Sequence, residues 1–175
     1  GGEPSLRKDL PSIIAAVSAT PGVRKIALTT NGCRLPQLVR TWREAGLTAL
    51  NVSLDSLDAA RFAAITGHDR FAEVTEGIEI AQTLGFDAVK LNAVLLRGLN
   101  DDELPAWLNY LRTRDVAVRF IELMRTGDNR EYFERHHYRA EALEEQLIAS
   151  GWTQQTRAAD AGPAREYAHP GYRGR

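Results

Sequence analysis

Polar and charged side chains alternate with apolar ones in four short, strand-like segments of the sequence. The candidates for ligand binding among them are Thr29, Ser53, Lys90 and Arg119. Successive side chains of a strand point to opposite faces, so we expect these residues to share one face of a sheet while apolar neighbours fill the other. The polar face then borders either a binding cavity or plain solvent. In a cavity, Lys90 and Arg119 would favour an anionic ligand such as a phosphate.

Two short motifs add further candidates. The sequence opens with Gly1-Gly2-Glu3-Pro4, whose glycines would let a ligand approach the backbone and whose carboxylate could pair with an ammonium group. A simple turn is the alternative. Thr29-Thr30-Asn31-Gly32 follows a predicted strand and precedes a helix, which is where α/β folds bind ligands. A helix-capping turn would use the same residues.

The cysteine and the paired histidines give weaker signals. Cys33 is the only cysteine, so it forms no internal disulfide and cannot by itself hold a metal ion or a cluster. We interpret it as a small packing residue. His136 and His137 are adjacent and should point apart, which makes them surface histidines rather than a chelating pair.

These positions require strands that lie side by side. We predict strands at residues 25–29, 49–54, 88–94 and 116–121. The stretches between them carry apolar residues at helical spacing. This order predicts a mostly parallel α/β sheet, either open or curled as a barrel.

The sequence after Met124 is more polar and has a different organisation. We expect a long loop at 125–139, a helix at 139–150, and a β-hairpin whose strands, 152–156 and 165–169, are joined by residues 160–163. The predicted domains are therefore 1–124 and 125–175.

Composition excludes several classes of protein. The 175 residues are 43% hydrophobic and 26% charged, which is typical of an ordinary globular chain. No stretch is long and apolar enough to span a membrane. A net charge of −1 argues against a broad nucleic-acid surface. The single cysteine favours a reducing, cytoplasmic location.

Read in order, the sequence contains the segments GGEPSLRKDL, LTTNG, NVSLDSLD, FAAITGHDRFAEVTEGI, VKLNAVLLRGLNDDE, VRFIELM and GPAREY. Together they resemble the GTP 3′,8-cyclases (molybdenum cofactor biosynthesis protein A), a family of radical S-adenosylmethionine (SAM) enzymes, over essentially the whole chain. The resemblance implies an incomplete TIM-like (βα)6 barrel that holds SAM on a [4Fe–4S] cluster with GTP deeper inside. It also implies a radical that abstracts hydrogen from the GTP ribose before ring closure, in the first step of molybdenum cofactor biosynthesis.

The resemblance also implies roles for individual residues. Gly2 and Glu3 belong to the segment that meets the amino group of SAM, and Lys90 falls on a position that contacts GTP. Further SAM contacts fall on Thr29, Ser53, Arg119 and Met124. The expected partner is GTP, and a homodimer is expected in solution.

The sequence departs from the family at the cluster ligands. The family's CxxxCxxC loop would precede Gly1, and its second [4Fe–4S] cluster uses cysteines beyond Arg175. Cys33 matches neither set. We therefore expect the chain to be an internal fragment that is inactive alone, with unpaired strand edges that promote dimerisation.

Two other functions stay open at this point. The chain could be a nucleotide-binding module without redox chemistry, or another radical SAM enzyme that shares only the GGEP portion. Whether the encoding gene continues with the cluster cysteines on both sides would discriminate between a truncated enzyme and a binding module.

Overall fold

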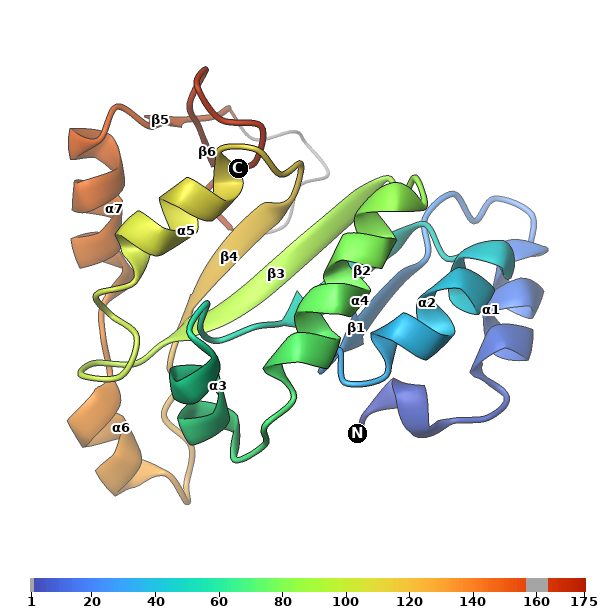
Figure 1. Cartoon of the computed structure of the whole chain (residues 1–175), viewed down its shortest axis with the longest axis horizontal. Coiled ribbons are helices and arrows are strands. Elements are labelled where there is room, and N and C mark those ends of the chain that lie inside the picture. Colours follow the sequence, from blue (N-terminus) through green and yellow to red (C-terminus); the bar gives the residue numbers. More distant parts are fainter. Residues whose placement is uncertain (1, 157–163) are drawn as a thin grey trace. The chain divides into compact units, whose positions relative to one another are not determined.

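The computed structural model describes residues 2–156 and 164–175 (Figure 1). Its elements are η1 (Pro4–Leu6), α1 (Leu10–Ser18), β1 (Ala27–Thr30), α2 (Leu35–Glu44), β2 (Ala49–Ser53), α3 (Ala59–Thr66), α4 (Phe71–Thr83), β3 (Ala88–Leu95), α5 (Leu104–Leu111), β4 (Ala117–Glu122), α6 (Arg130–His136), α7 (Ala140–Ala149), β5 (Thr153–Gln154) and β6 (Tyr167–Ala168). All four strands predicted for the sheet are present, with ends shifted by one or two residues. The predicted fold class is confirmed: helices alternate with the strands of one sheet, and a small hairpin follows.

The chain divides into two compact units, Gly1–Ala93 (unit 1) and Val94–Arg175 (unit 2). The sheet has the strand order β1-β2-β3-β4, and β1–β2 and β2–β3 pair in parallel. The domain boundary predicted between residues 124 and 125 follows the change in sequence character rather than this division, and it stays a prediction.

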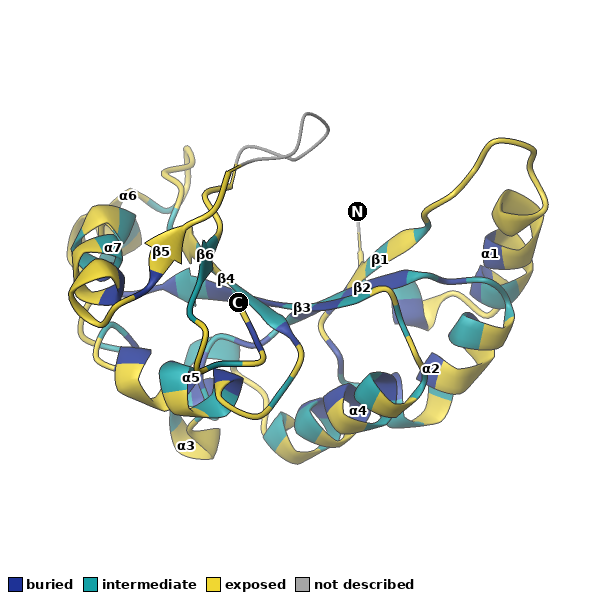
Figure 2. Ribbon diagram, turned by 90° about the horizontal axis from the view of Figure 1, so that it is seen from above, coloured by how far each residue is buried: buried dark blue, intermediate teal, exposed yellow. Residues whose placement is uncertain are grey.

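In unit 1, helices α2 and α4 pack side by side against one face of strands β1 to β3 (Figure 2). This face supplies the core of the unit, including the buried residues Leu50, Val52 and Leu91. Gly77 allows the two helices to approach closely, because a Cβ there would lie 2.2 Å from Leu35 Cβ. Burial of apolar area on this face stabilises the sheet by roughly 25 cal/mol per Å².

Burial alternates along the strands as the sequence pattern predicts. In β3 the residues alternate between half-buried and buried throughout, and β2 follows the same alternation from Leu50 to Ser53. No helix of unit 1, among the residues that the structure describes, covers the opposite side of β1 to β3 (Figure 2). We call that side, with Thr29, Asn51, Ser53, Lys90 and Asn92, the polar face.

Helix ends follow local sequence rules. Pro11, Pro36 and Pro105 lie in the first turns of α1, α2 and α5, where a missing amide donor costs nothing. The Asp58 carboxylate caps α3 by accepting a hydrogen bond from the Arg61 amide at 2.9 Å.

In unit 2, the prediction of a loop over residues 125–139 is wrong, because Arg130–His136 forms helix α6. None of the residues of α6 is buried, so the segment has no apolar stripe by which a helix is recognised. A turn in which Asn129 accepts from the Thr126 amide at 2.7 Å leads into the helix. An Arg130–Glu134 ion pair at 2.9 Å then links two successive turns.

The helix and hairpin predicted near the C-terminus are confirmed. Helix α7 covers Ala140–Ala149, and β5 and β6 pair antiparallel. The predicted turn at residues 160–163 lies outside the described residues. No helix within the described part of the chain is long and apolar enough to cross a membrane.

Candidate functional site

The polar face places three side chains in one row across three strands. Thr29 of β1 is in register with Asn51 of β2, and Asn51 is in register with Lys90 of β3. Neighbouring strands lie about 4.8 Å apart, so the row brings a hydroxyl, an amide and a cation together. Of these residues, Thr29 and Lys90 belong to the predicted site, and both lie on the predicted face.

Asn51 links the row by a hydrogen bond. Its Nδ2 donates to Thr29 Oγ1 at 3.2 Å. This bond orients the Thr29 hydroxyl. Strand alternation puts Asn51 on the polar face, and its position between Thr29 and Lys90 follows from the strand register.

A second row lies further towards the carboxyl ends of the strands. Ser53 of β2 is in register with Asn92 of β3. The Asn92 Oδ1 atom is buried and has no hydrogen-bond partner in the structure. A buried, unpaired acceptor costs about 1–3 kcal/mol, which a hydrogen-bond donor on a ligand would recover.

The GGEP motif is fixed to the carboxyl end of β1 by the Glu3 carboxylate. Oε1 accepts hydrogen bonds from the Ser5 amide at 3.0 Å and from Thr30 Oγ1 at 2.5 Å. Oε2 accepts from the Asn31 amide at 2.8 Å. Partial burial acts to raise the pKa of Glu3, but hydrogen bonds from Thr30, Asn31 and Ser5 outweigh it and leave that pKa below its ordinary value.

Gly2 precedes this anchor and has open space beside it. A Cβ built on Gly2 would meet nothing within 4 Å, so the backbone there is accessible to another molecule. The Gly2–Glu3 dipeptide therefore combines an accessible backbone with an anchored carboxylate.

The TTNG segment is a strand-to-helix turn with a structural function. The buried Thr30 hydroxyl accepts from the Gly32 amide at 3.2 Å. Gly32 has φ 79°, and a Cβ there would lie 2.9 Å from Val52 Cγ1. Burial raises the pKa of the Cys33 thiol, which agrees with its interpretation as a packing residue and not as an activated nucleophile.

Two predicted site residues belong to unit 2. Arg119 lies in β4 and is exposed. Met124 follows the same strand and is 74% exposed.

The two adjacent histidines have separate partners, as predicted. His136 Nδ1 lies 2.9 Å from the Arg97 carbonyl oxygen, and His137 Nε2 lies 3.3 Å from Glu122 Oε2. Glu122 Oε1 also accepts a hydrogen bond from the Ala140 amide at 2.8 Å. These contacts connect β4, α6 and the start of α7, and they serve the packing of unit 2.

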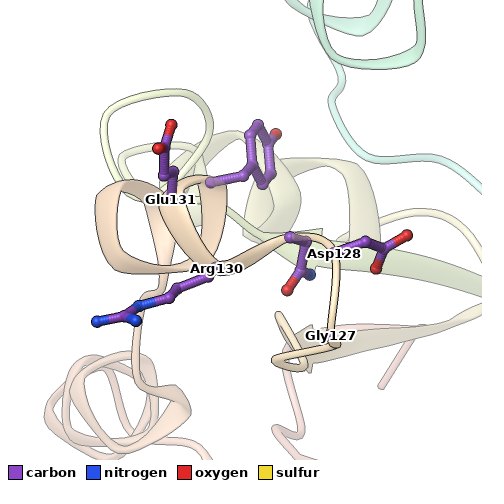
Figure 3. Close-up of a pocket in the computed structure, with 6 residues that line it drawn as sticks. Gly127, Asp128, Arg130 and Glu131 are labelled. Atoms are coloured by element: carbon purple, nitrogen blue, oxygen red, sulfur yellow. The ribbon is translucent and has the colours of Figure 1, made fainter.

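A depression of about 480 Å³ lies at the start of α6, between Gly127 and Tyr132 (Figure 3). The side chains of Asp128, Arg130 and Glu131 point away from one another in this view. Because its charges do not converge, the depression does not resemble a ligand site, and it contains none of the predicted site residues.

Comparison with known proteins relates this geometry to a family. A solved structure of TYW1 with a lysine-pyruvate adduct bound has a similar fold, with a TM-score of 0.61 and 18% identity over 92% of this chain and 52% of that chain. The family model described as Radical SAM superfamily matches residues 1–111. The chain belongs to the radical SAM superfamily.

Curated relatives of this radical SAM chain carry the name GTP 3′,8-cyclase. One, from Stenotrophomonas maltophilia (strain R551-3), is 66% identical over 99% of this chain and 53% of its own length. Another, from Vibrio atlanticus (strain LGP32), is 51% identical over 99% of this chain and 52% of its own length. The chain thus spans about half the length of the curated relatives that it matches.

Radical SAM proteins use SAM together with a [4Fe–4S] cluster. The described residues fit SAM but not the cluster. Open space beside Gly2 and the unpaired Asn92 Oδ1 on the polar face suit a polar ligand such as SAM. A cluster needs several thiolates. Cys33 is the only cysteine of the 175 residues, and within 2–156 and 164–175 no three His, Cys, Asp or Glu side chains lie close enough to hold a metal ion.

Proposed function

We propose that the chain forms the nucleotide- and SAM-binding part of a GTP 3′,8-cyclase, the enzyme that converts GTP to (8S)-3′,8-cyclo-7,8-dihydroguanosine 5′-triphosphate in molybdenum cofactor biosynthesis. Relatives of that name cover 99% of the chain. The observation that carries the proposal is the row of Thr29, Asn51 and Lys90 on the polar face. Parallel strands covered by helices on both faces are apolar on both, so a polar row is consistent with a face that borders solvent or a ligand.

In this proposal Lys90 contacts GTP, because a fixed ammonium group favours a triphosphate. The proposed SAM-binding residues are Gly2, Glu3, Thr29, Ser53, Arg119 and Met124. When bound next to a cluster, SAM supplies the radical chemistry. The chain's own part is to bind and orient the two ligands and to keep water away from them.

We further propose that these 175 residues do not catalyse the reaction by themselves, since Cys33 is their only cysteine. Two [4Fe–4S] clusters would need ligands from outside this sequence. Anaerobic incubation of the chain with iron and sulfide should therefore leave no [4Fe–4S] signal in its electron paramagnetic resonance spectrum after reduction. A stable cluster signal would contradict this part of the proposal.

The single cysteine also favours a second candidate, a nucleotide-binding module without redox chemistry. Both candidates use Lys90, but only the first needs Ser53 for SAM. Isothermal titration with S-adenosylhomocysteine and with GTP discriminates between them. We expect S-adenosylhomocysteine to bind and GTP to bind only weakly. Ser53→Ala should lower the affinity for S-adenosylhomocysteine, while the exposed control Ser12→Ala should not. Binding of GTP without S-adenosylhomocysteine would favour the module, and binding of neither would contradict both candidates.

The proposal includes a homodimer and a cytoplasmic location. Strand β1 ends the strand order and pairs with β2, so its other edge carries backbone groups available for pairing. Ile13 and Val17 of α1 are each 39% exposed and add apolar surface to the same unit. Sedimentation equilibrium should show dimers, and a monomer over a wide concentration range would contradict the proposed dimer.

A further inference from the structure

We infer that Glu3 is a positioning residue: its carboxylate fixes the GGEP segment to the end of β1, and the accessible backbone of Gly2 meets the ligand. This inference rests on the proposed SAM site. It differs from a direct ion pair between Glu3 and the amino group of SAM, which the motif alone would suggest.

The contacts of the carboxylate carry the inference. Both oxygens accept hydrogen bonds, from the Ser5 amide, the Thr30 hydroxyl and the Asn31 amide, at 3.0, 2.5 and 2.8 Å. A carboxylate offers about four acceptor positions, so protein donors use most of them. The donors come from Ser5, directly after the GGEP segment, and from the end of β1, so the carboxylate joins two segments that are distant in sequence.

Thr30 connects this anchor to the core of unit 1. Its side chain is 2% exposed, and its hydroxyl accepts from the Gly32 amide while donating to Glu3. Gly32 in turn packs against Val52 and Val74. Thr30 therefore supports Glu3 from the buried side of the strand and cannot touch a ligand on the polar face.

Ser5 and Arg34 strengthen the same junction. The Ser5 carbonyl accepts from Arg34 Nη1 at 2.9 Å, which ties η1 to the residue that precedes α2. Gly2, by contrast, has no such restraint on the side where a Cβ would project. The arrangement gives a rigid anchor next to an accessible backbone group, as a ligand-binding turn requires.

The two roles predict different responses to the ligand's amino group. If Glu3 contacts that group directly, Glu3→Gln lowers the affinity for S-adenosylhomocysteine. It does not lower the affinity for an analogue in which hydrogen replaces the amino group. If Glu3 positions the segment, the substitution lowers the affinities for both ligands by the same factor. Thr30→Val removes the buried hydroxyl, with its hydrogen bonds to Glu3 and to the Gly32 amide, and should then give the same pattern.

Isothermal titration of the full chain at pH 7 measures the affinities for both ligands and tests which role is correct. We expect Glu3→Gln and Thr30→Val each to lower the affinity for both ligands about tenfold, similar to the loss when hydrogen bonds that support a metal ligand are removed. The matched control Asp58→Asn alters a capping carboxylate of α3 and should leave both affinities unchanged. A loss for Glu3→Gln that is at least tenfold larger for the amino-bearing ligand would overturn the inference.

A second measurement separates this inference from the proposed function. If the wild-type chain binds neither ligand, the proposed SAM site fails. A double-mutant cycle measured by urea unfolding then tests whether the Glu3 carboxylate and the Thr30 hydroxyl stabilise the chain as a unit. The effects of Glu3→Gln and Thr30→Val on the midpoint should be strongly non-additive. Additive effects would show that the carboxylate and the hydroxyl do not act as a unit, which would overturn the inference.

Discussion

The side-chain amide of Asn51 donates a hydrogen bond to the Thr29 hydroxyl at 3.2 Å, and its other neighbour in the register is Lys90. Asn51 therefore stands between two residues of the proposed site. This position makes it a sensitive point at which to change the charge of the polar face without altering Lys90 itself.

Asn51→Asp should lower the affinity for GTP more than Asn51→Ala does. The new carboxylate would lie near Lys90 and repel the phosphates, an effect of about 1 kcal/mol or more, or roughly fivefold or more in affinity. Titration with GTP at low and at high salt measures this difference, which should shrink as salt screens the charges. Equal affinities of the two variants would indicate that GTP binds away from Asn51.

Gly32→Ala should destabilise the chain more than Gly67→Ala. Both glycines have positive φ, 79° and 74°, so both substitutions strain the backbone by about 1–2 kcal/mol. Only at Gly32 would the new methyl also collide with Val52 and Val74, which adds about 1–3 kcal/mol. Urea unfolding of both variants gives the comparison, and equal losses would contradict the close packing of this turn.

The stabilisation by Glu3 should depend on pH. Hydrogen bonds from Thr30, Asn31 and Ser5 overcome the effect of burial and lower the pKa of Glu3 in the folded chain. A carboxyl whose pKa is lowered on folding stabilises the fold above its unfolded pKa, about 4.3, and loses that effect as the pH falls through its folded pKa. Because Glu3 is partly exposed and solvent screens its contacts, Glu3→Gln should cost about 0.5–1 kcal/mol at pH 7 and progressively less below pH 4.3. A cost that is the same at pH 7 and pH 3 would contradict this prediction.

The pKa of Tyr167 should reveal the contact between the C-terminal hairpin and α7. The Tyr167 hydroxyl donates to the Glu144 carboxylate, and Arg165 pairs with the same group. Burial, and then this carboxylate, raises the pKa of Tyr167 above its ordinary value. Glu144→Gln should lower that pKa, so that tyrosinate absorbance appears at lower pH, while Glu145→Gln, at the next position of α7, should not. Tyr167→Phe identifies the signal, and the same titration curve for wild type and Glu144→Gln would contradict the contact.

Alternation in the strands could be predicted from the sequence, because side chains of a strand change face at every residue. It predicts that Thr29, Ser53 and Lys90 lie on the polar face. Their partners could not be predicted in this way. The bond from Asn51 to Thr29 depends on strand register, and the bond from Thr30 to Glu3 joins residues separated by 27 positions.

Helix α6 shows the opposite case, in which local sequence carries little information. Its residues are mostly polar and none is buried, so neither periodicity nor composition distinguishes it from a loop. The turn at Thr126–Asn129 and the Arg130–Glu134 pair stabilise it locally. The proposed roles of Arg119 and Met124 came from the resemblance to a family and stay predictions.

Titration of GTP into the wild-type chain, Lys90→Ala and Lys25→Ala tests the proposed nucleotide site most directly. Removing a charge-assisted contact to phosphate costs about 1.5–3 kcal/mol, so Lys90→Ala should bind GTP about 10- to 150-fold more weakly. Lys25 is exposed ahead of β1, and its loss should leave the affinity unchanged. Equal affinities of wild type and Lys90→Ala would contradict the claim that the polar face of the sheet binds the nucleotide.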